Sequence, residues 1–267
     1  MNRYEQSFAS TARDNRIAFI PFAVAGDPYM RLSEKIFRTY IDAGADILEI
    51  GYPFSDPMAD GPVNQRAAQR ALEAGITPDS FFAMLSNLRR ITDIPFGLLL
   101  YANTVHHLGY ETFCARAADA GVDSILVADM PPEESGDFLA ALQKNSLKSV
   151  FIVSELTPTD RAEYICEHSS GFVYVVSRLG TTGVQTDFSG SVHDTLSRLR
   201  GLGDKRLCVG FGLSTPDHVR RVKEAGADGA IVGSALVKII EAHHGQPESD
   251  MLQALHHAVG EFRSATQ

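Results

Sequence analysis

Three copies of one four-residue pattern constrain the fold of this chain more than any other feature. Residues 43–46, 120–123 and 225–228 each read alanine, glycine, a small apolar residue and aspartate. Each copy follows a helix-like stretch and precedes an apolar run, and its glycine suits the left-handed position that ends a helix. A repeated joint of this kind indicates a chain in which helices and strands alternate.

Eight apolar runs are predicted to be strands. They are residues 17–25, 47–50, 96–101, 124–128, 149–154, 172–177, 206–210 and 229–233. Runs that are apolar throughout indicate strands buried on both faces, as in a parallel sheet covered by helices. Pro21 lies inside the first run, and we therefore expect a bulge or a shortened strand there.

The strand count and the chain length favour a closed barrel. With 267 residues and no break in composition, residues 1–267 are expected to form a single (β/α)8 TIM barrel domain rather than an open doubly wound sheet. Helical stripes separate the runs, as in residues 110–118, where apolar residues recur at i, i+3, i+4, i+7 and i+8. Residues 251–262 predict an additional C-terminal helix.

Charge and cysteine content exclude several classes of function. A net charge of -9 argues against nucleic acid or an anionic membrane as the main partner. No apolar run approaches the ~18 residues of a membrane span. The three cysteines are far apart and lack a metal or redox spacing, which predicts small core residues in a reducing compartment. We expect a cytoplasmic protein.

The segment 46–62 places carboxylates where chemistry is possible. Glu49 lies inside the apolar run 47–50, and the loop after it, rich in proline, aspartate and glycine, carries Asp56 and Asp60. Burying a carboxylate is costly unless it is paired or used. The segment alone is compatible with an acid–base site and with a structural carboxylate paired to an arginine.

Glycine-rich loops follow the last three predicted strands, at 178–183, 210–216 and 233–236. Glycine lets backbone N–H groups approach an anion, and a helix N-terminus favours negative charge. Each loop alone could be a tight turn. Together they predict a phosphate site, since such sites on barrels lie after the seventh and eighth strands.

Other chemistries find little support in the sequence. No lysine ends a predicted strand, which argues against a Schiff-base or pyridoxal enzyme. The histidines lack H-x-H and HExxH spacings, which argues against a catalytic metal, and no GxSxG motif occurs. The carboxylates remain, with Tyr101, Tyr174 and Thr182 as hydroxyl donors, although each tyrosine could equally pack in the core.

The carboxylate segment also resembles a known family. Residues 49–62, Glu-Ile-Gly-Tyr-Pro-Phe-Ser-Asp-Pro-Met-Ala-Asp-Gly-Pro, are similar to the signature of the tryptophan synthase alpha subunit family. The similarity spans nearly the whole chain, through residues 20–28, 97–103, 128–134, 180–183, 210–212 and 233–234. The carboxylate loop is specific to the family, whereas the glycine loops occur in other phosphate-binding barrels.

The resemblance implies a retro-aldol cleavage of indole-3-glycerol phosphate to indole and D-glyceraldehyde 3-phosphate, without metal or cofactor. Glu49 would be the general acid–base, with its pKa raised by desolvation, and Asp60 would bind the indole N–H. Thr182 would close over Asp60. The implied substrate residues are Phe22, Leu99, Tyr101, Leu126, Ile152, Tyr174, Thr182 and Phe211, and the implied phosphate ligands are Gly183, Gly212, Gly233 and Ser234.

The resemblance also implies a partner. The family hands indole to a pyridoxal phosphate-dependent beta subunit for L-tryptophan synthesis, within an alpha2beta2 tetramer. Contacts are expected from the loop 53–60 and the segment 103–107, around Pro53, Asp56, Asn103 and His106.

Two alternatives stay open. One is another phosphate-binding barrel lyase or isomerase, such as indole-glycerol-phosphate synthase, whose catalytic lysine at a strand end is missing here. The other is a non-catalytic regulatory subunit of a beta partner. The presence of both Glu49 and Asp60 argues against this second alternative.

Overall fold

Parallel strands form the centre of the molecule. A computed structural model describes residues 1–176 and 188–267, and the side chains of 188–191 are not part of that description. The nine strands in these residues are β1 (Ala18–Val24), β2 (Leu48–Gly51), β3 (Phe96–Leu100), β4 (Ser124–Val127), β5 (Lys148–Ser149), β6 (Phe151–Ser154), β7 (Val173–Val176), β8 (Leu207–Gly210) and β9 (Gly229–Val232).

The sheet closes on itself almost completely. Its order is β5-β4-β3-β2-β1-β9-β8-β7-β6, and every pairing is parallel. Only Val150 separates β5 from β6, so the two ends of the sheet belong to one interrupted strand. Counted in this way the strands number eight, and the predicted TIM barrel is confirmed. The interruption at Val150 is a difference from the continuous strand expected at 149–154.

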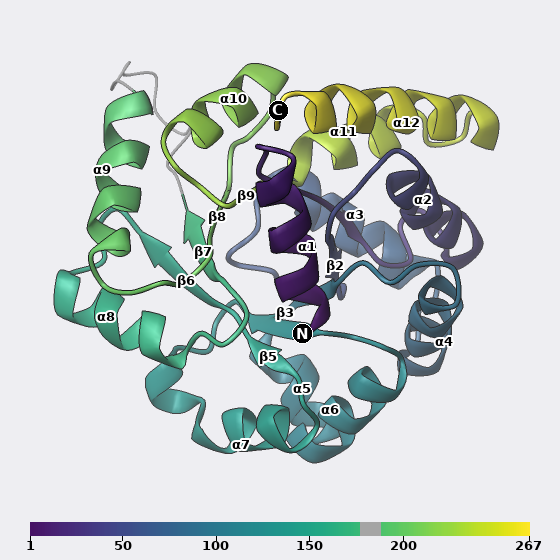
Figure 1. Ribbon diagram of the computed structural model, residues 1–267. Coiled ribbons are helices and arrows are strands. Elements are labelled where there is room, and N and C mark those ends of the chain that lie inside the picture. The colour runs from purple at the N-terminus through teal and green to yellow at the C-terminus, as the bar shows by residue number, and fades with distance from the viewer. Residues whose placement is uncertain (177–187) are drawn as a thin grey trace.

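Helices form a ring around the barrel (Figure 1). In the described residues they are α1 (Arg3–Arg13), α2 (Met30–Asp42), α3 (Pro62–Glu73), α4 (Pro78–Arg89), α5 (Ala102–Leu108), α6 (Tyr110–Asp119), α7 (Gly136–Lys144), α8 (Thr159–His168), α9 (Phe188–Arg200), α10 (Pro216–Glu224), α11 (Ser234–Ala242) and α12 (Glu248–Ser264), with a short 3-10 turn η1 (Pro132–Glu134). The predicted C-terminal helix is α12, which packs on α2 and α11.

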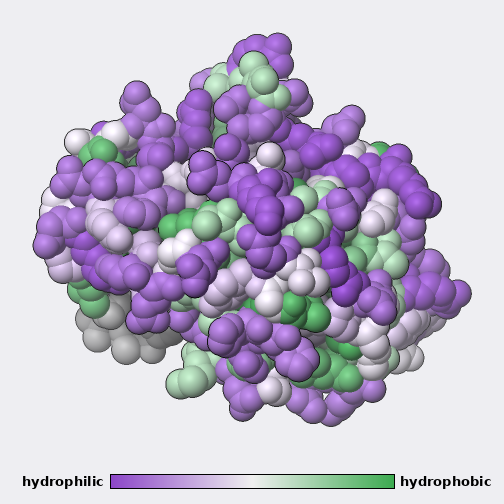
Figure 2. Space-filling view, turned by 90° about the horizontal axis from the view of Figure 1, so that it is seen from below, coloured by the Kyte–Doolittle hydropathy of each residue, from purple (hydrophilic) through white to green (hydrophobic). Residues whose placement is uncertain are grey.

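One side of the molecule is largely polar (Figure 2). The face seen in Figure 2 is covered largely by hydrophilic residues. None of the described helices combines the length and the apolar character that crossing a membrane requires.

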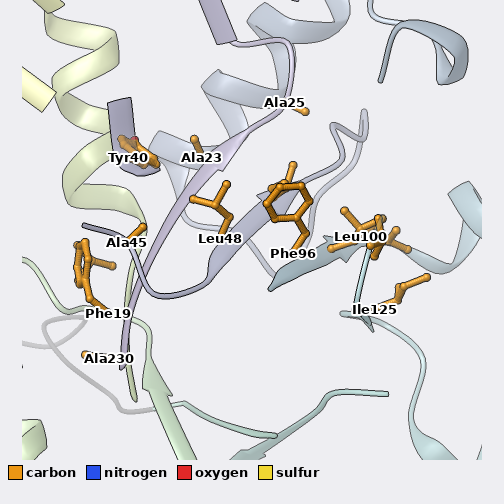
Figure 3. Packing of buried hydrophobic residues seen from close by; sticks show 14 of the residues in the cluster. Phe19, Ala23, Ala25, Tyr40, Ala45, Leu48, Phe96, Leu100, Ile125 and Ala230 are labelled. Carbon is orange, nitrogen blue, oxygen red and sulfur yellow. The ribbon is translucent and has the colours of Figure 1, made fainter. Parts of the chain in front are cut away.

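Apolar side chains fill both sides of the barrel wall. Phe19, Leu48 and Phe96, from three neighbouring strands, pack outward in the layer beneath the helices (Figure 3). A second cluster fills the barrel interior and includes Ile20 and Ile47. This double burial explains why the strands are apolar throughout. The three cysteines are buried and free, as predicted.

Helix α1 closes one end of the barrel, at the centre of the ring in Figure 1. Tyr4 and Phe8 belong to the interior cluster. The Tyr4 hydroxyl hydrogen-bonds Ser124 Oγ, at the first residue of β4, over 2.6 Å. The N-terminal ends of the strands are therefore covered, and a ligand must enter at their C-terminal ends.

The expectation for Pro21 was wrong. β1 is continuous over seven buried residues and is neither bulged nor shortened. Its register with β9 ends at Pro21, and its register with β2 begins at Phe22. Proline has no N–H to donate. Because Pro21 lies where pairing with β9 ends and pairing with β2 begins, the missing donor does not interrupt the hydrogen bonds of either pair.

The repeated joint has the conformation that its glycines predict. Gly44, Gly121 and Gly226 follow α2, α6 and α10 with φ values of 96°, 83° and 91°. Side chains with a Cβ rarely adopt this left-handed region. The predicted helix ends are confirmed.

The aspartate of each joint fastens two strands together. Asp123 donates its N–H to Phe96 O and accepts the Phe96 N–H at Oδ2, both over 2.9 Å. Asp46 forms the same reciprocal pair with Phe19, and Asp228 forms it with Leu207. Each aspartate also pairs with an arginine. The repeat therefore links neighbouring strands at the closed end of the barrel.

We expect Asp123→Ala to lower the free energy of unfolding by about 2–4 kcal/mol, because Arg89 loses its carboxylate partner and the buried Phe96 N–H loses its acceptor. Arg89 Nη2 lies 3.1 Å from Asp123 Oδ2. Urea unfolding measures the change. The control is Asp79→Ala, which breaks an ion pair whose aspartate is 90% exposed and should cost less than about 1 kcal/mol. Equal losses in the two variants would contradict this role of the joint.

Candidate active site

A cavity of about 200 Å³ opens among the C-terminal ends of the strands. Its walls come from β1, β2, β3, β7 and β9 and from the loops that follow β2, β8 and β9. The lining residues are Phe22, Glu49, Asp60, Gly61, Asn64, Leu99, Tyr174, Phe211, Gly212, Leu213, Ile231, Gly233 and Ser234. The structure thus brings both predicted carboxylates, part of the predicted apolar slot and the glycine loops around one space.

Glu49 points into the barrel. It lies within β2, where Leu48 and Ile50 on either side pack outward under the helices, so the alternation of the strand turns Glu49 inward. Its side chain is almost fully buried, and no arginine or lysine of the described residues pairs with it. Desolvation, with a smaller contribution from the negative charge of Asp60, raises the pKa of Glu49 to about 8. The raised pKa predicted for this group is confirmed, and such a carboxyl can both donate and accept a proton near neutral pH.

Asp60 has a different environment, at the end of the loop that leads into α3. Tyr101 Oη donates to Asp60 Oδ2 over 2.8 Å, and Asn64 Nδ2 donates to Oδ1 over 3.3 Å. Burial raises the pKa of Asp60, and these two hydrogen bonds oppose the rise. Two carboxyl groups whose surroundings differ in this way can take different roles in one reaction.

An apolar wall faces the carboxyl groups. Phe22, Leu99, Tyr174 and Phe211, all predicted as substrate residues, line the cavity. Leu126 belongs to the interior cluster together with Tyr174, and Ile152 packs against this cluster, as Leu99 does. Tyr101 reaches the site through its hydrogen bond to Asp60.

Glycines make room for two of these aromatic rings. A Cβ at Gly210 would lie within 2.6 Å of Tyr174 Cζ. One at Gly51 would lie 2.8 Å from the Phe22 ring, and one at Gly233 would lie 3.1 Å from it. These positions therefore need glycine for close packing as well as for any anion site.

The loops after β8 and β9 form the part of the wall predicted to bind phosphate. Gly212, Gly233 and Ser234 all line the cavity, and α11 begins at Ser234. The first N–H groups of a helix lack intrahelical acceptors and attract anions. Phe211 has φ 71°, a strained backbone that is typical of ligand-binding positions. Thr182 and Gly183 lie outside the described residues.

Sequence reasoning did not identify Asn64, Gly61, Leu213 and Ile231, which also line the cavity. For Asn64 a signal existed. It starts a stripe at helical spacing with the buried Ala67, Ala68 and Ala71, so a polar residue occupies the inward face of α3. Within the described ranges, no group of three His, Cys, Asp or Glu side chains is arranged to hold a metal ion.

The loop after β2 and the start of α5 lie side by side next to the site. Pro53, Phe54, Asn103 and His107 line a separate hollow of about 240 Å³. The Phe54 ring stacks on Tyr101, with ring centroids 5.2 Å apart. Met58 in the same loop is 92% exposed, which leaves an apolar side chain available to a partner.

Comparison with known proteins agrees with this geometry. The family model described as "Tryptophan synthase alpha chain" matches residues 8–267. A tryptophan synthase alpha chain of Methanothermobacter thermautotrophicus is 46% identical over 95% of this chain and 93% of its own length. One of Vibrio vulnificus is 43% identical over the full length of both chains. The crystal structure of tryptophan synthase subunit alpha from Legionella pneumophila superposes with a TM-score of 0.89 at 33% identity, covering 100% of this chain and 98% of that one.

Proposed function

The chain belongs to the tryptophan synthase alpha chain family, and we propose that it cleaves indole-3-glycerol phosphate by moving protons between the substrate and two carboxyl groups. It is a lyase of tryptophan biosynthesis. The observation that supports the proposed chemistry best is Glu49, a buried carboxyl that faces the cavity with a pKa of about 8.

Glu49 starts the reaction in its protonated form. It donates its proton to the indole ring carbon that carries the glycerol phosphate chain. The bond between this carbon and the chain then breaks, and its electron pair returns to the ring. The hydroxyl on the carbon that becomes the aldehyde gives its proton to the Glu49 carboxylate. The acid is thereby regenerated, and the products are indole and D-glyceraldehyde 3-phosphate.

Asp60 acts as the second carboxyl, in its ionised form. Protonation of the ring carbon places positive charge on the indole system, and the ring N–H then becomes a stronger donor. A carboxylate held in place by Tyr101 and Asn64 stabilises that charge without reorganising. Phe22, Leu99 and Phe211 would hold the indole ring, and Tyr174 would lie beside it.

The phosphate would bind at the opposite side of the cavity, at Gly212, Gly233 and Ser234. The backbone N–H groups at the start of α11 support this assignment. Gly183 and Thr182 remain predicted contacts from outside the described residues. Every proposed step uses groups of the chain and the substrate, so the reaction needs no cofactor of its own.

Membership of the family implies a beta subunit as partner. We propose an alpha2beta2 assembly in which Pro53, Asp56, Asn103 and His106 contact this subunit, the only one expected to carry pyridoxal phosphate. The stacking of Phe54 on Tyr101, and the hydrogen bond from Tyr101 to Asp60, would connect the docking loop to the site. A biosynthetic enzyme whose three cysteines are free is expected to work in the cytoplasm.

The pH dependence of cleavage tests this division of roles. We expect kcat/KM for indole-3-glycerol phosphate to rise as Asp60 ionises and to fall above about pH 8, as Glu49 loses the proton that it must donate. The acidic limb should lie above the ordinary pKa of an aspartate, because burial raises the pKa of Asp60. Release of indole and glyceraldehyde 3-phosphate in equal amounts is the readout. Activity that keeps rising to pH 10 would exclude Glu49 as the acid.

A further inference from the structure

Asn64 occupies an unexpected place for an amide. It lies in the first turn of α3, on the helix face that continues with Ala67, Ala68 and Ala71. These alanines are buried in an apolar cluster with Phe22 and Val237. A leucine has the same branching and the same number of side-chain heavy atoms as asparagine, and it would suit such a face better. The amide therefore calls for an explanation other than packing.

The contacts of Asn64 point to Asp60. Its Nδ2 donates to Asp60 Oδ1 over 3.3 Å, while its own Oδ1 is buried with no hydrogen-bond partner in the described part of the chain. An ionised carboxylate only accepts hydrogen bonds, so the amide must turn its NH2 group toward Asp60. Leaving a buried carbonyl unpaired is unfavourable. Within the described residues, the amide therefore gives up a hydrogen bond at Oδ1 while its NH2 group reaches the carboxylate.

We propose that Asn64 is a positioning residue of the lyase reaction, which forms with Tyr101 a two-sided clamp that keeps Asp60 ionised. The inference rests on the proposed role of Asp60 toward the indole N–H. Each oxygen of the carboxylate has one donor, Tyr101 on Oδ2 and Asn64 on Oδ1. Tyr101 is itself anchored, because it stacks on Phe54 and accepts the Ala59 N–H over 3.1 Å.

The surroundings of Asp60 explain why it needs such a clamp. Among the described residues, the other titratable groups that face the carboxylate are Glu49 from β2, Tyr101 from the end of β3 and Tyr174 from β7. No lysine or arginine of the described residues forms an ion pair with Asp60. Burial raises the pKa of Asp60, and in the described part of the chain the two neutral donors Tyr101 and Asn64 oppose that rise. Removing either donor should therefore shift the carboxyl toward its protonated, inactive form.

Two substitutions test the clamp. Asn64→Leu removes the donor and keeps the branching and the number of heavy atoms, and Asn64→Asp replaces the donor with a second carboxyl. The matched control is Gln69→Leu, which removes an amide on the exposed side of the same helix whose NH2 group donates to Glu73. The pH profile of kcat/KM for indole-3-glycerol phosphate is measured for each. The Asp60 carboxyl is titrated directly by NMR with ¹³C-labelled aspartate and assigned by the signal lost in Asp60→Asn.

We expect the Asp60 signal to titrate at higher pH in Asn64→Leu than in the wild type, and at still higher pH in Asn64→Asp. On the acidic limb, kcat/KM of Asn64→Leu should fall by about 3- to 10-fold, the worth of one hydrogen bond. It should approach the wild-type value once Asp60 is fully ionised. Gln69→Leu should match the wild type throughout.

An Asp60 signal that titrates at the same pH in the wild type and in Asn64→Leu would overturn the inference, whatever the activity. An equal loss of kcat/KM at every pH would also overturn it, because this is the result of a merely structural change. A shifted signal with an unchanged pH–rate profile would support the clamp and refute instead the proposed role of Asp60 in cleavage.

Discussion

Glu49→Gln should reduce the turnover of indole-3-glycerol phosphate by about 10²–10⁴-fold, the usual contribution of a positioned acid–base. Glutamine keeps the size and the hydrogen-bonding capacity of the side chain but cannot give a proton to the ring carbon. Steady-state release of indole measures the effect. Substrate affinity should change little, because the apolar wall and the phosphate loops are untouched. Near-normal turnover in this variant would remove Glu49 from the mechanism.

The stability of the same variant shows whether a loss of activity comes from the missing proton donor or from unfolding. The pKa of Glu49 in the folded chain is about 8, above its ordinary value of 4.5. The folded state therefore holds a proton that the unfolded state releases, and the wild type loses stability as the pH rises between these values. Glutamine has no proton to lose, so the variant does not lose stability in this way as the pH rises. At pH 8, Glu49→Gln should unfold in urea at a concentration equal to or higher than the wild type.

A beta subunit should raise the lyase activity of the chain by about 5- to 150-fold, the range that 1–3 kcal/mol of coupling allows. The connection from the docking loop to the active site is short. Phe54 in this loop stacks on Tyr101, which donates a hydrogen bond to Asp60 and accepts one from the Ala59 N–H. A partner that prefers one arrangement of this loop must shift its population toward that arrangement. Indole release with and without the partner measures the stimulation.

Asp56→Ala should reduce this stimulation more than the basal rate, since Asp56 is exposed in the same loop and does not line the cavity. The control is Asp42→Ala, which alters an exposed aspartate near the C-terminal end of α2, at the closed end of the barrel. It should leave both rates unchanged. A loss of the same size in the basal and the stimulated rate of Asp56→Ala would place Asp56 in the catalytic site rather than at the docking surface.

The barrel could be predicted because its determinants are local. Uninterrupted apolar runs and a left-handed glycine after a helix are visible within a few residues, and Gly44, Gly121 and Gly226 behave as their surroundings indicate. Pro21 misled the prediction, because the effect of a proline depends on which neighbouring strand its position faces. The same holds for Val150, where a strand that appears continuous in sequence is interrupted in the sheet.

The site could be predicted in part. Glu49 and Asp60 attract notice as carboxylates in and after an apolar strand, and the cavity brings them together. Asn64 could not be connected with Asp60, because an asparagine near the start of a helix is common and only the turn from the loop into α3 brings its amide to the carboxylate. Nor could the sequence tell that Tyr4 and Phe8 cover the other end of the barrel, which leaves one entrance to the site.

Direct titration of Glu49 by NMR, with ¹³C-labelled glutamate and assignment by Glu49→Gln, tests the central claim most directly. The proposed proton transfer requires a carboxyl group that keeps its proton at neutral pH inside the barrel. It predicts a midpoint near pH 8 for the free enzyme. A midpoint near the ordinary value of 4.5 would mean that Glu49 is charged at neutral pH and cannot be the acid that starts the cleavage.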